Sequence, residues 1–292
     1  MNLLLNLVSK ILPFIAIGYL AGRLKSGRIE NIIKSFVEFS LNILIPLFVF
    51  FTVWSIPPSL DILSAGRVIL ISVSVVVAGA FYAALFSRIF QSKFKDIALP
   101  IMFMNSAYLA IPLNALLFGR EGMFLAIVYN IVITFLHFSA GILIVSGSFK
   151  EILKLPILYF AAAGIILNIL GINMPREISV FSNLLSAVTL SVMLMLVGYQ
   201  ACPVYDSVLL KTSSAVVLRM AGGFFSALLF CEIFGIIDVT RQVCLLTSGM
   251  PAAVNSYILA KRYGADFSFA ASAISIGLIA SLIFIPFILW LM

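Results

Sequence analysis

Long apolar runs separated by short polar stretches make up almost the whole chain. A helix needs about 20 predominantly apolar residues to cross the hydrocarbon core of a bilayer, and the 292 residues hold about ten such runs. They cover approximately residues 3–22, 32–54, 65–86, 99–119, 123–145, 155–170, 181–199, 213–236, 243–264 and 267–291. The pattern therefore predicts an all-α polytopic membrane protein with ten transmembrane helices.

The fourth and ninth runs are interrupted by polar residues and prolines. The fourth, LPIMFMNSAYLAIPLNALLFG, carries Asn105 and Pro112, and the ninth, VCLLTSGMPAAVNSYILAKRYG, carries Pro251 and Asn255. Hydrocarbon offers no water to polar groups, and proline has no amide hydrogen to donate. We therefore expect two broken helices. A pair of interrupted spans at matching places in two halves indicates a transporter site at the bilayer midplane.

The composition excludes most classes of soluble protein. Hydrophobic residues make up 63% of the chain and charged residues 10%, and the mean hydropathy is +1.21, whereas soluble domains carry roughly 25% charged residues. The first apolar run is followed by Gly22-Arg23-Leu24-Lys25 instead of a cleavage pattern. We therefore expect this run to remain in the bilayer as a span.

The charge and the cysteines give no indication of a nucleic-acid or metal partner. The net charge of +7 is spread over many loops, so it indicates membrane topology and not nucleic-acid binding. The three cysteines have no CxxC pair or metal-ligand spacing, and the single histidine cannot build a conventional zinc site. We predict no metal and no cofactor, and sodium or proton coupling is left open.

The basic residues predict the orientation, because cytoplasmic loops carry an excess of lysine and arginine. If the N-terminus lies outside, the cytoplasmic loops hold Arg23, Lys25, Arg28, Lys34, Arg88, Lys93, Lys95, Lys150, Lys154, Lys211, Lys261 and Arg262. The outer loops then hold only Arg67, Arg120, Arg176 and Arg241. We therefore expect a multi-pass protein of the cell membrane with its N- and C-termini outside.

The span count also predicts an inverted repeat. Residues 1–146 hold five spans, residues 147–154 form a cytoplasmic linker, and residues 155–292 hold five more. Because five is odd, the second half enters the membrane upside down. A shift of 145 residues also places Phe118-Gly119 on Tyr263-Gly264, which is the weak internal similarity expected of a duplication.

If the two broken helices cross at their breaks, two half-helix N-termini face one pocket, and their free amide groups and partial positive charge favour an anion. Asn105 and Asn255 add amide groups, and hydroxyls come from Ser106, Tyr108, Thr247, Ser248 and Ser256. Neither break carries the titratable carboxylate that a cation/proton exchanger needs. The crossing therefore favours an anionic or zwitterionic solute.

Several ionisable residues inside the predicted spans could mark ion coupling. Lys10, Arg219 and Glu232 lie close enough to span ends for us to expect that their charged groups reach the interface. Glu38 and His137 lie deeper, and they are the candidates for a proton-sensitive role.

The interrupted spans resemble those of the auxin efflux carrier family, which includes plant PIN proteins and prokaryotic permeases. NSAYLAIPLNALLFG resembles the family's pattern in the fourth span, and MPAAVNSYILAKRYGAD resembles its pattern in the ninth. LPFIAIGYLAGRL in the first span and LIPLFVF in the second are similar to the family as well.

The resemblance implies two inverted five-helix repeats, in a fold like that of bile-acid transporters and sodium/proton antiporters. It implies a scaffold of spans one, two, six and seven and a moving transport domain of spans three to five and eight to ten. Family members are often homodimers through the scaffold. The substrate site is carried onto Asn105, Pro112, Pro251 and Asn255, with Pro46 on the scaffold side.

We therefore expect a secondary transporter or facilitator that moves a small organic anion, such as malate, malonate or auxin, by alternating access. A sodium-coupled symporter of the same fold is one alternative. A channel and an intramembrane enzyme are alternatives of other classes, although no catalytic motif accompanies the serines and the histidine.

Overall fold

The computed structural model describes residues 2–23, 31–32, 35–36, 38–55, 62–145, 156–199 and 209–292, and this part of the chain is helical apart from short links. Its elements are α1 (Asn2–Arg23), the π-helical turn η1 (Ser40–Leu44), α3 (Ile45–Trp54), α4 (Ile62–Ile89), α5 (Phe94–Met102), α6 (Ala110–Leu136), the π-helical turn η2 (His137–Gly141), α7 (Ile142–Val145), α8 (Pro156–Ile169), α9 (Arg176–Tyr199), α10 (Leu209–Ile233), α11 (Asp238–Ser248), α12 (Asn255–Tyr263) and α13 (Phe267–Leu291). The expected linker 147–154 lies outside the described residues.

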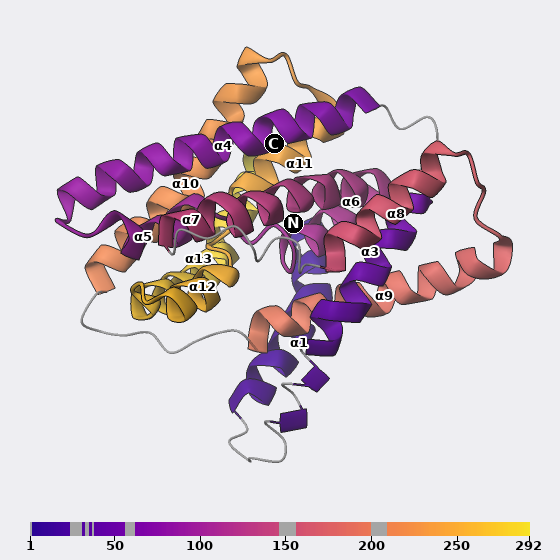
Figure 1. Cartoon of the computed structure of the whole chain (residues 1–292), viewed down its shortest axis with the longest axis horizontal. Helices are drawn as coiled ribbons and strands as arrows, with labels where there is room; N and C mark the ends of the chain where they lie inside the picture. The colour runs from indigo at the N-terminus through magenta and orange to yellow at the C-terminus, as the bar shows by residue number, and fades with distance from the viewer. Residues whose placement is uncertain are drawn as a thin grey trace. The chain divides into compact units, whose positions relative to one another are not determined.

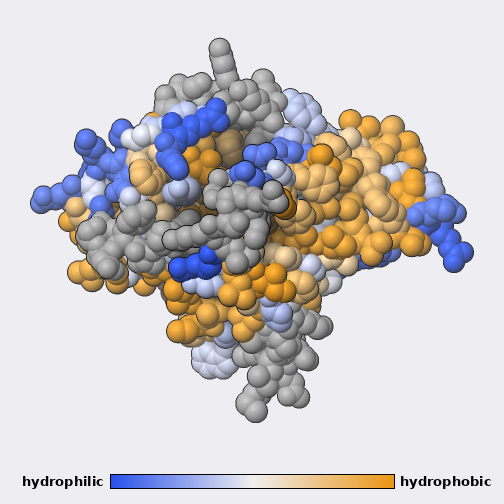
Figure 2. Space-filling view, turned by 90° about the horizontal axis from the view of Figure 1, so that it is seen from below, coloured by the Kyte–Doolittle hydropathy of each residue, from blue (hydrophilic) through white to orange (hydrophobic). Residues whose placement is uncertain are grey.

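The described helices have the length and composition of a helical membrane protein. Five are long and apolar enough to cross a bilayer, namely Leu63–Ile89, Ala110–Val145, Arg176–Leu196, Leu209–Ile233 and Phe267–Leu291. Large apolar side chains such as Phe81, Ile283 and Trp290 are exposed, and Figure 2 shows broad apolar areas on the surface. Such areas suit contact with lipid better than contact with water. The number of ten spans stays a prediction.

The chain forms two compact units. Unit 1 combines Met1–Asp61 with Leu153–Gln200, and unit 2 combines Ile62–Ile152 with Ala201–Met292. Each unit therefore joins segments from both halves of the sequence. In Figure 1, α1 packs beside α9 within unit 1, and α4 packs beside α10 within unit 2.

In unit 1, α1 and α9 approach until their backbones touch. A Cβ atom on Gly18 would overlap the carbonyl oxygen of Met195, and one on Gly198 would overlap the carbonyl oxygen of Ile15. Small residues allow this close packing in membrane helices, where the hydrophobic effect does not drive association.

In unit 2, both interrupted spans are broken. The first break separates α5 from α6 and contains Asn105, and the second separates α11 from α12 and contains Pro251. The first break is shorter than expected, because Pro112 is already the third residue of α6. Proline is tolerated in the first turn of a helix, where an amide hydrogen has no helical acceptor.

The two breaks cross as a short antiparallel ribbon. The amide of Asn105 donates to the carbonyl of Pro251 over 2.7 Å, and the amide of Ala253 donates to the carbonyl of Phe103 over 2.9 Å. Met104 and Ala252 form the bridge between these bonds. Backbone groups that left the helices thus satisfy each other, as groups far from water must.

Within α6 the chain turns back at Gly119, whose φ of 62° and ψ of −146° are not helical. A Cβ atom on Gly122 would lie 2.8 Å from the carbonyl oxygen of Asn114, whereas residues eight apart in a straight helix are separated by about 12 Å. The positive φ favours glycine. The turn brings the later part of α6 back beside the crossing.

Candidate functional site

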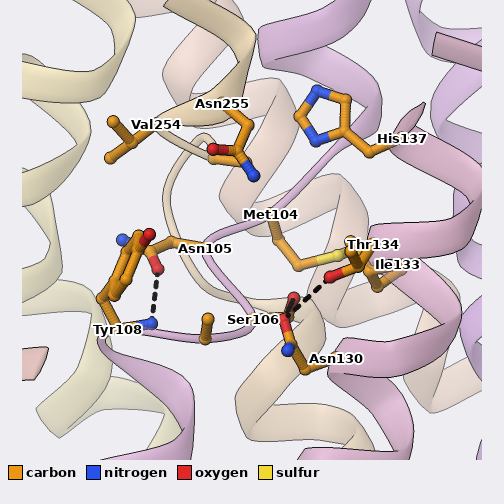
Figure 3. A pocket seen from close by; sticks show the side chains of 12 residues that line it. Met104, Asn105, Ser106, Tyr108, Asn130, Ile133, Thr134, His137, Val254 and Asn255 are labelled. Carbon is orange, nitrogen blue, oxygen red and sulfur yellow. Dashed lines mark hydrogen bonds between the residues drawn. The ribbon is translucent and has the colours of Figure 1, made fainter. Parts of the chain in front are cut away.

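A small cavity lies beside the crossing, entirely within unit 2 (Figure 3). Its wall is formed by Met104, Asn105, Ser106, Ala107, Tyr108, Asn130, Ile133, Thr134, His137, Ala253, Val254 and Asn255. The cavity volume is about 30 Å³, which is room for one to three water molecules. An organic solute therefore needs a wider form of the site.

Asn105 lines this cavity and carries an unused hydrogen-bond donor. Its side chain is 3% exposed, and its Oδ1 accepts from the amide of Tyr108 over 3.1 Å. Its Nδ2 is buried and has no hydrogen-bond partner among the described residues. A buried donor left unpaired costs about 1–3 kcal/mol, so this amide is a group that a bound acceptor would satisfy.

Two helix N-termini begin at the cavity wall. Tyr108 lies two residues before the first residue of α6, and Asn255 is the first residue of α12. Helix N-termini carry partial positive charge. In both helices, amides of the first turn already donate to carbonyls three or four residues earlier, so the partial charge is what they offer to the cavity. No carboxylate belongs to the wall, so the cavity is an electrically neutral site with a bias towards anions.

The later part of α6 contributes Asn130, which sequence reasoning missed. Its Oδ1 accepts from the hydroxyl of Ser106 over 2.9 Å and lies 3.5 Å from the hydroxyl of Thr134. In the sequence, Asn130 is a polar residue within an apolar run, and this pattern could have drawn attention to it. In the structure it is buried. Its place on the wall depends on the turn at Gly119.

His137 lies on the cavity wall two turns after Asn130, at the start of η2. Its ring stacks on Phe103 with centroids 4.1 Å apart, and its Nε2 lies 3.5 Å from the hydroxyl of Ser256. Figure 3 shows the ring beside Asn255. π-helical turns often occur at functional sites. The position puts the histidine at the cavity, and its proton-sensitive role stays a prediction.

Other expected site residues lie near the crossing and away from the cavity wall. Thr247 accepts from Asn114 Nδ2 over 3.1 Å, and the hydroxyls of Ser248 and Tyr129 are hydrogen-bonded over 2.8 Å. These contacts join the end of α11 to α6. The remaining expected residues that are buried but do not line the cavity are Pro112, Pro251 and Ser256.

The two expected residues of unit 1 are placed differently from each other. Pro46 is buried at the second position of α3, directly after the π-helical turn η1. Glu38 is exposed. Both belong to a different compact unit from the cavity.

Arg219 lies in a different environment from the one expected from the sequence. The expectation that it reaches the membrane interface is wrong, because its side chain is only 2% exposed. Nη1 donates to the carbonyls of Ile101 and Met102 over 3.0 and 2.8 Å, and Nη2 donates to the carbonyl of Ser248 over 2.9 Å. One guanidinium therefore caps the inner ends of both α5 and α11.

Glu232 lies at the end of α10 and forms an ion pair with Arg241, with 2.9 Å between Nη2 and Oε1. This carboxylate is exposed, as expected for a residue at a span end. Among the described residues, no group of three histidine, cysteine, aspartate or glutamate side chains could hold a metal ion.

The fold and the cavity define a class, a helical membrane protein in which two broken helices cross beside a neutral polar cavity. The chain is similar to a protein named an uncharacterized transporter from Methanothermobacter thermautotrophicus. The two are 25% identical over 269 residues, which cover 86% of this chain and 85% of that protein. No family model matches the chain. The similarity supports a membrane transporter in general terms.

Proposed function

We propose that the protein is a secondary transporter or facilitator of a small organic anion, and that it belongs to the auxin efflux carriers. The observation that carries this proposal is the unpaired, buried Nδ2 of Asn105, a residue of the cavity wall at the crossing. A carboxylate of the substrate would accept from this amide. The relative's printed name points in the same direction and away from an enzyme.

The charges around the crossing support an anionic substrate. Arg219 compensates the negative ends of α5 and α11, whereas the positive ends of α6 and α12 have no carboxylate on the cavity wall. A bound anion would balance these two N-termini. A cationic substrate would find no such complement.

Alternating access is supported by two observations. The cavity is too small for an organic acid in this form, so binding and release require the site to widen. The breaks belong to unit 2, which holds spans three to five and eight to ten, while unit 1 holds spans one, two, six and seven. We infer that unit 2 moves the site while unit 1 serves as the scaffold.

The decisive experiment compares Asn105→Ala with Asn42→Ala. Asn42 is an exposed asparagine of unit 1 whose Nδ2 donates to the carbonyl of Glu38, so its variant is a matched control. Dissociation constants would be measured for a panel of organic acids with detergent-purified protein, and uptake would be measured in proteoliposomes.

We expect Asn105→Ala to weaken binding roughly 10- to 100-fold, because a hydrogen bond to a charged group contributes about 1.5–3 kcal/mol. The Asn42→Ala protein should bind and transport like the unmodified protein. Normal binding and uptake by a folded Asn105→Ala protein would contradict the proposed site.

The alternatives of other classes give different results in the same preparations. A channel would pass an unsaturable current across a planar bilayer. A hydrolytic enzyme would need a nucleophile and a base, and Ser256 lies 3.5 Å from His137. The ring of this histidine is stacked on Phe103, and no carboxylate is hydrogen-bonded to it among the described residues. Loss of turnover with Ser256→Ala would be the signature of that class.

A further inference from the structure

Arg219 is a buried charge whose partners are backbone groups. Its three hydrogen bonds all end on carbonyl oxygens, and its Nε has no partner among the described residues. Among the described residues, its hydrogen-bond partners include no carboxylate. Burying an uncompensated cation is costly. The compensation here comes from the C-terminal ends of α5 and α11, which carry partial negative charge.

The surroundings of the guanidinium are shaped to fit it. Gly223 lies one turn after Arg219 on α10, and a Cβ atom there would overlap both Nη2 and the carbonyl oxygen of Ser248. The guanidinium therefore passes through a space that a larger residue would close. Two helices that are far apart in sequence supply its acceptors, so this one side chain links the ends of α5 and α11.

Carbonyl oxygens at half-helix C-termini are the groups with which broken-helix carriers coordinate a coupling cation. In this chain Arg219 already occupies three such oxygens. We propose that Arg219 is a resident cation of the crossing, so that the carbonyls of Ile101, Met102 and Ser248 become a site for an external cation when the guanidinium is removed. This inference rests on the proposed function and deepens it, because it assigns Arg219 as the cation that compensates the helix C-termini at the same crossing.

The test uses melting temperatures of the full-length purified protein without any substrate, so its outcome does not depend on the proposed cargo. Arg219→Ala and the unmodified protein are compared in choline chloride, in sodium chloride, and in choline chloride with about 10 mM guanidinium chloride. Arg241→Ala is the matched control, because Arg241 pairs with Glu232 at a partly exposed position.

We expect Arg219→Ala to melt roughly 10 °C lower in choline, as follows from leaving buried acceptors unpaired. Guanidinium should restore at least half of that loss, and sodium should restore a smaller part. The unmodified protein and Arg241→Ala should respond to neither cation. Arg219→Lys keeps a cation near the carbonyls, so it should lose less stability and show a weaker response than Arg219→Ala.

Two results would overturn the inference. One is an Arg219→Ala protein whose lowered melting temperature responds to neither guanidinium nor sodium, which would leave Arg219 with a packing role alone. The other is an equal response to guanidinium in the unmodified protein. If Arg219→Ala does not fold in choline, the protein would be purified with guanidinium present. Recovery of folded protein would then support the cation site, and no recovery would indicate a packing role alone.

Discussion

Three residues at the crossing contribute different polar groups. Asn105 lines the cavity and carries an unpaired amide, Pro251 supplies the carbonyl that accepts from the Asn105 backbone, and Arg219 caps the ends of α5 and α11. The side-chain amide of Asn105 can donate to a ligand. The Pro251 carbonyl and the Arg219 guanidinium hold the backbone around the crossing in place. Substitutions at Asn105 and Arg219 therefore test different properties of the crossing.

Gly223 provides a prediction at the residue scale. Replacing it with alanine places a methyl group against Nη2 of Arg219 and the Ser248 carbonyl. We expect Gly223→Ala to lower the free energy of unfolding by about 1–3 kcal/mol, the usual effect of overpacking. Thermal unfolding of the purified protein would measure this change.

Gly66 is the control for that measurement. It lies in α4 at an exposed position, and no atom lies within 4 Å of the place of a Cβ atom. Alanine there should be neutral or stabilise the helix by about 0.5–1 kcal/mol. If Gly223→Ala matched Gly66→Ala in stability, the space around the guanidinium would be larger than the structure describes.

Some of these roles follow from residue types, and others do not. Asparagine and proline in an apolar run predicted the breaks, because membrane helices have few ways to satisfy them. The sequence could not show that Pro112 lies inside α6, since a proline suits the first turn of a helix as well as a break. It could not show the burial of Arg219 either, because the acceptors lie on helices 29 and 118 residues away.

At the scale of elements, the crossing is a meeting of four half-helices. α5 and α11 point their C-termini at it, and α6 and α12 begin there. Short helices in a membrane leave many unpaired backbone groups, and the ribbon between the breaks satisfies four of them with two hydrogen bonds. After the turn at Gly119, the returning helical segment adds a second wall.

A double cysteine variant tests this arrangement. Met104 and Ala252 face each other in the antiparallel bridge between the two ribbon hydrogen bonds. Residues in such a pair have Cα atoms about 4.5 Å apart, within the range of about 4.4–6.8 Å found for disulfides. We expect Met104→Cys with Ala252→Cys to form a disulfide under mild oxidation, in a protein whose own cysteines are replaced by alanine.

Intact mass and protection from alkylation would measure the disulfide. Met104→Cys with Ala253→Cys is the control, because consecutive residues of extended backbone point to opposite faces. We expect this second pair to stay reduced under the same conditions. Efficient oxidation of the control pair, or none of the first, would show that the breaks do not pair as described.

At the scale of the whole molecule, the sequence pattern located the long helices well. The apolar run 267–291 coincides with α13, and the run 65–86 lies within α4. Periodicity could not reveal that helices from both halves combine into each compact unit, because contacts between distant segments leave no trace in local hydropathy. The inverted repeat stays a prediction, since it concerns sides of a membrane that helix bounds do not define.

Two residues at corresponding positions can test the inversion. Lys93 directly precedes α5, and Ile237 directly precedes α11. Both are exposed, and each lies before the first half of a broken span. Because the basic loops predict opposite orientations for the two halves, Lys93 should face the cytoplasm and Ile237 the outside.

Single cysteines at these positions, introduced into the cysteine-free protein, would be treated with a membrane-impermeant maleimide on intact cells. We expect Ile237→Cys to react at once and Lys93→Cys to react only after the membrane is opened. Reaction of both from the same side would mean that the two halves run in parallel. From the crossing, α6 and α12 would then run towards the same face of the membrane, and the opposed pair of half-helices that the proposed anion site requires would not exist.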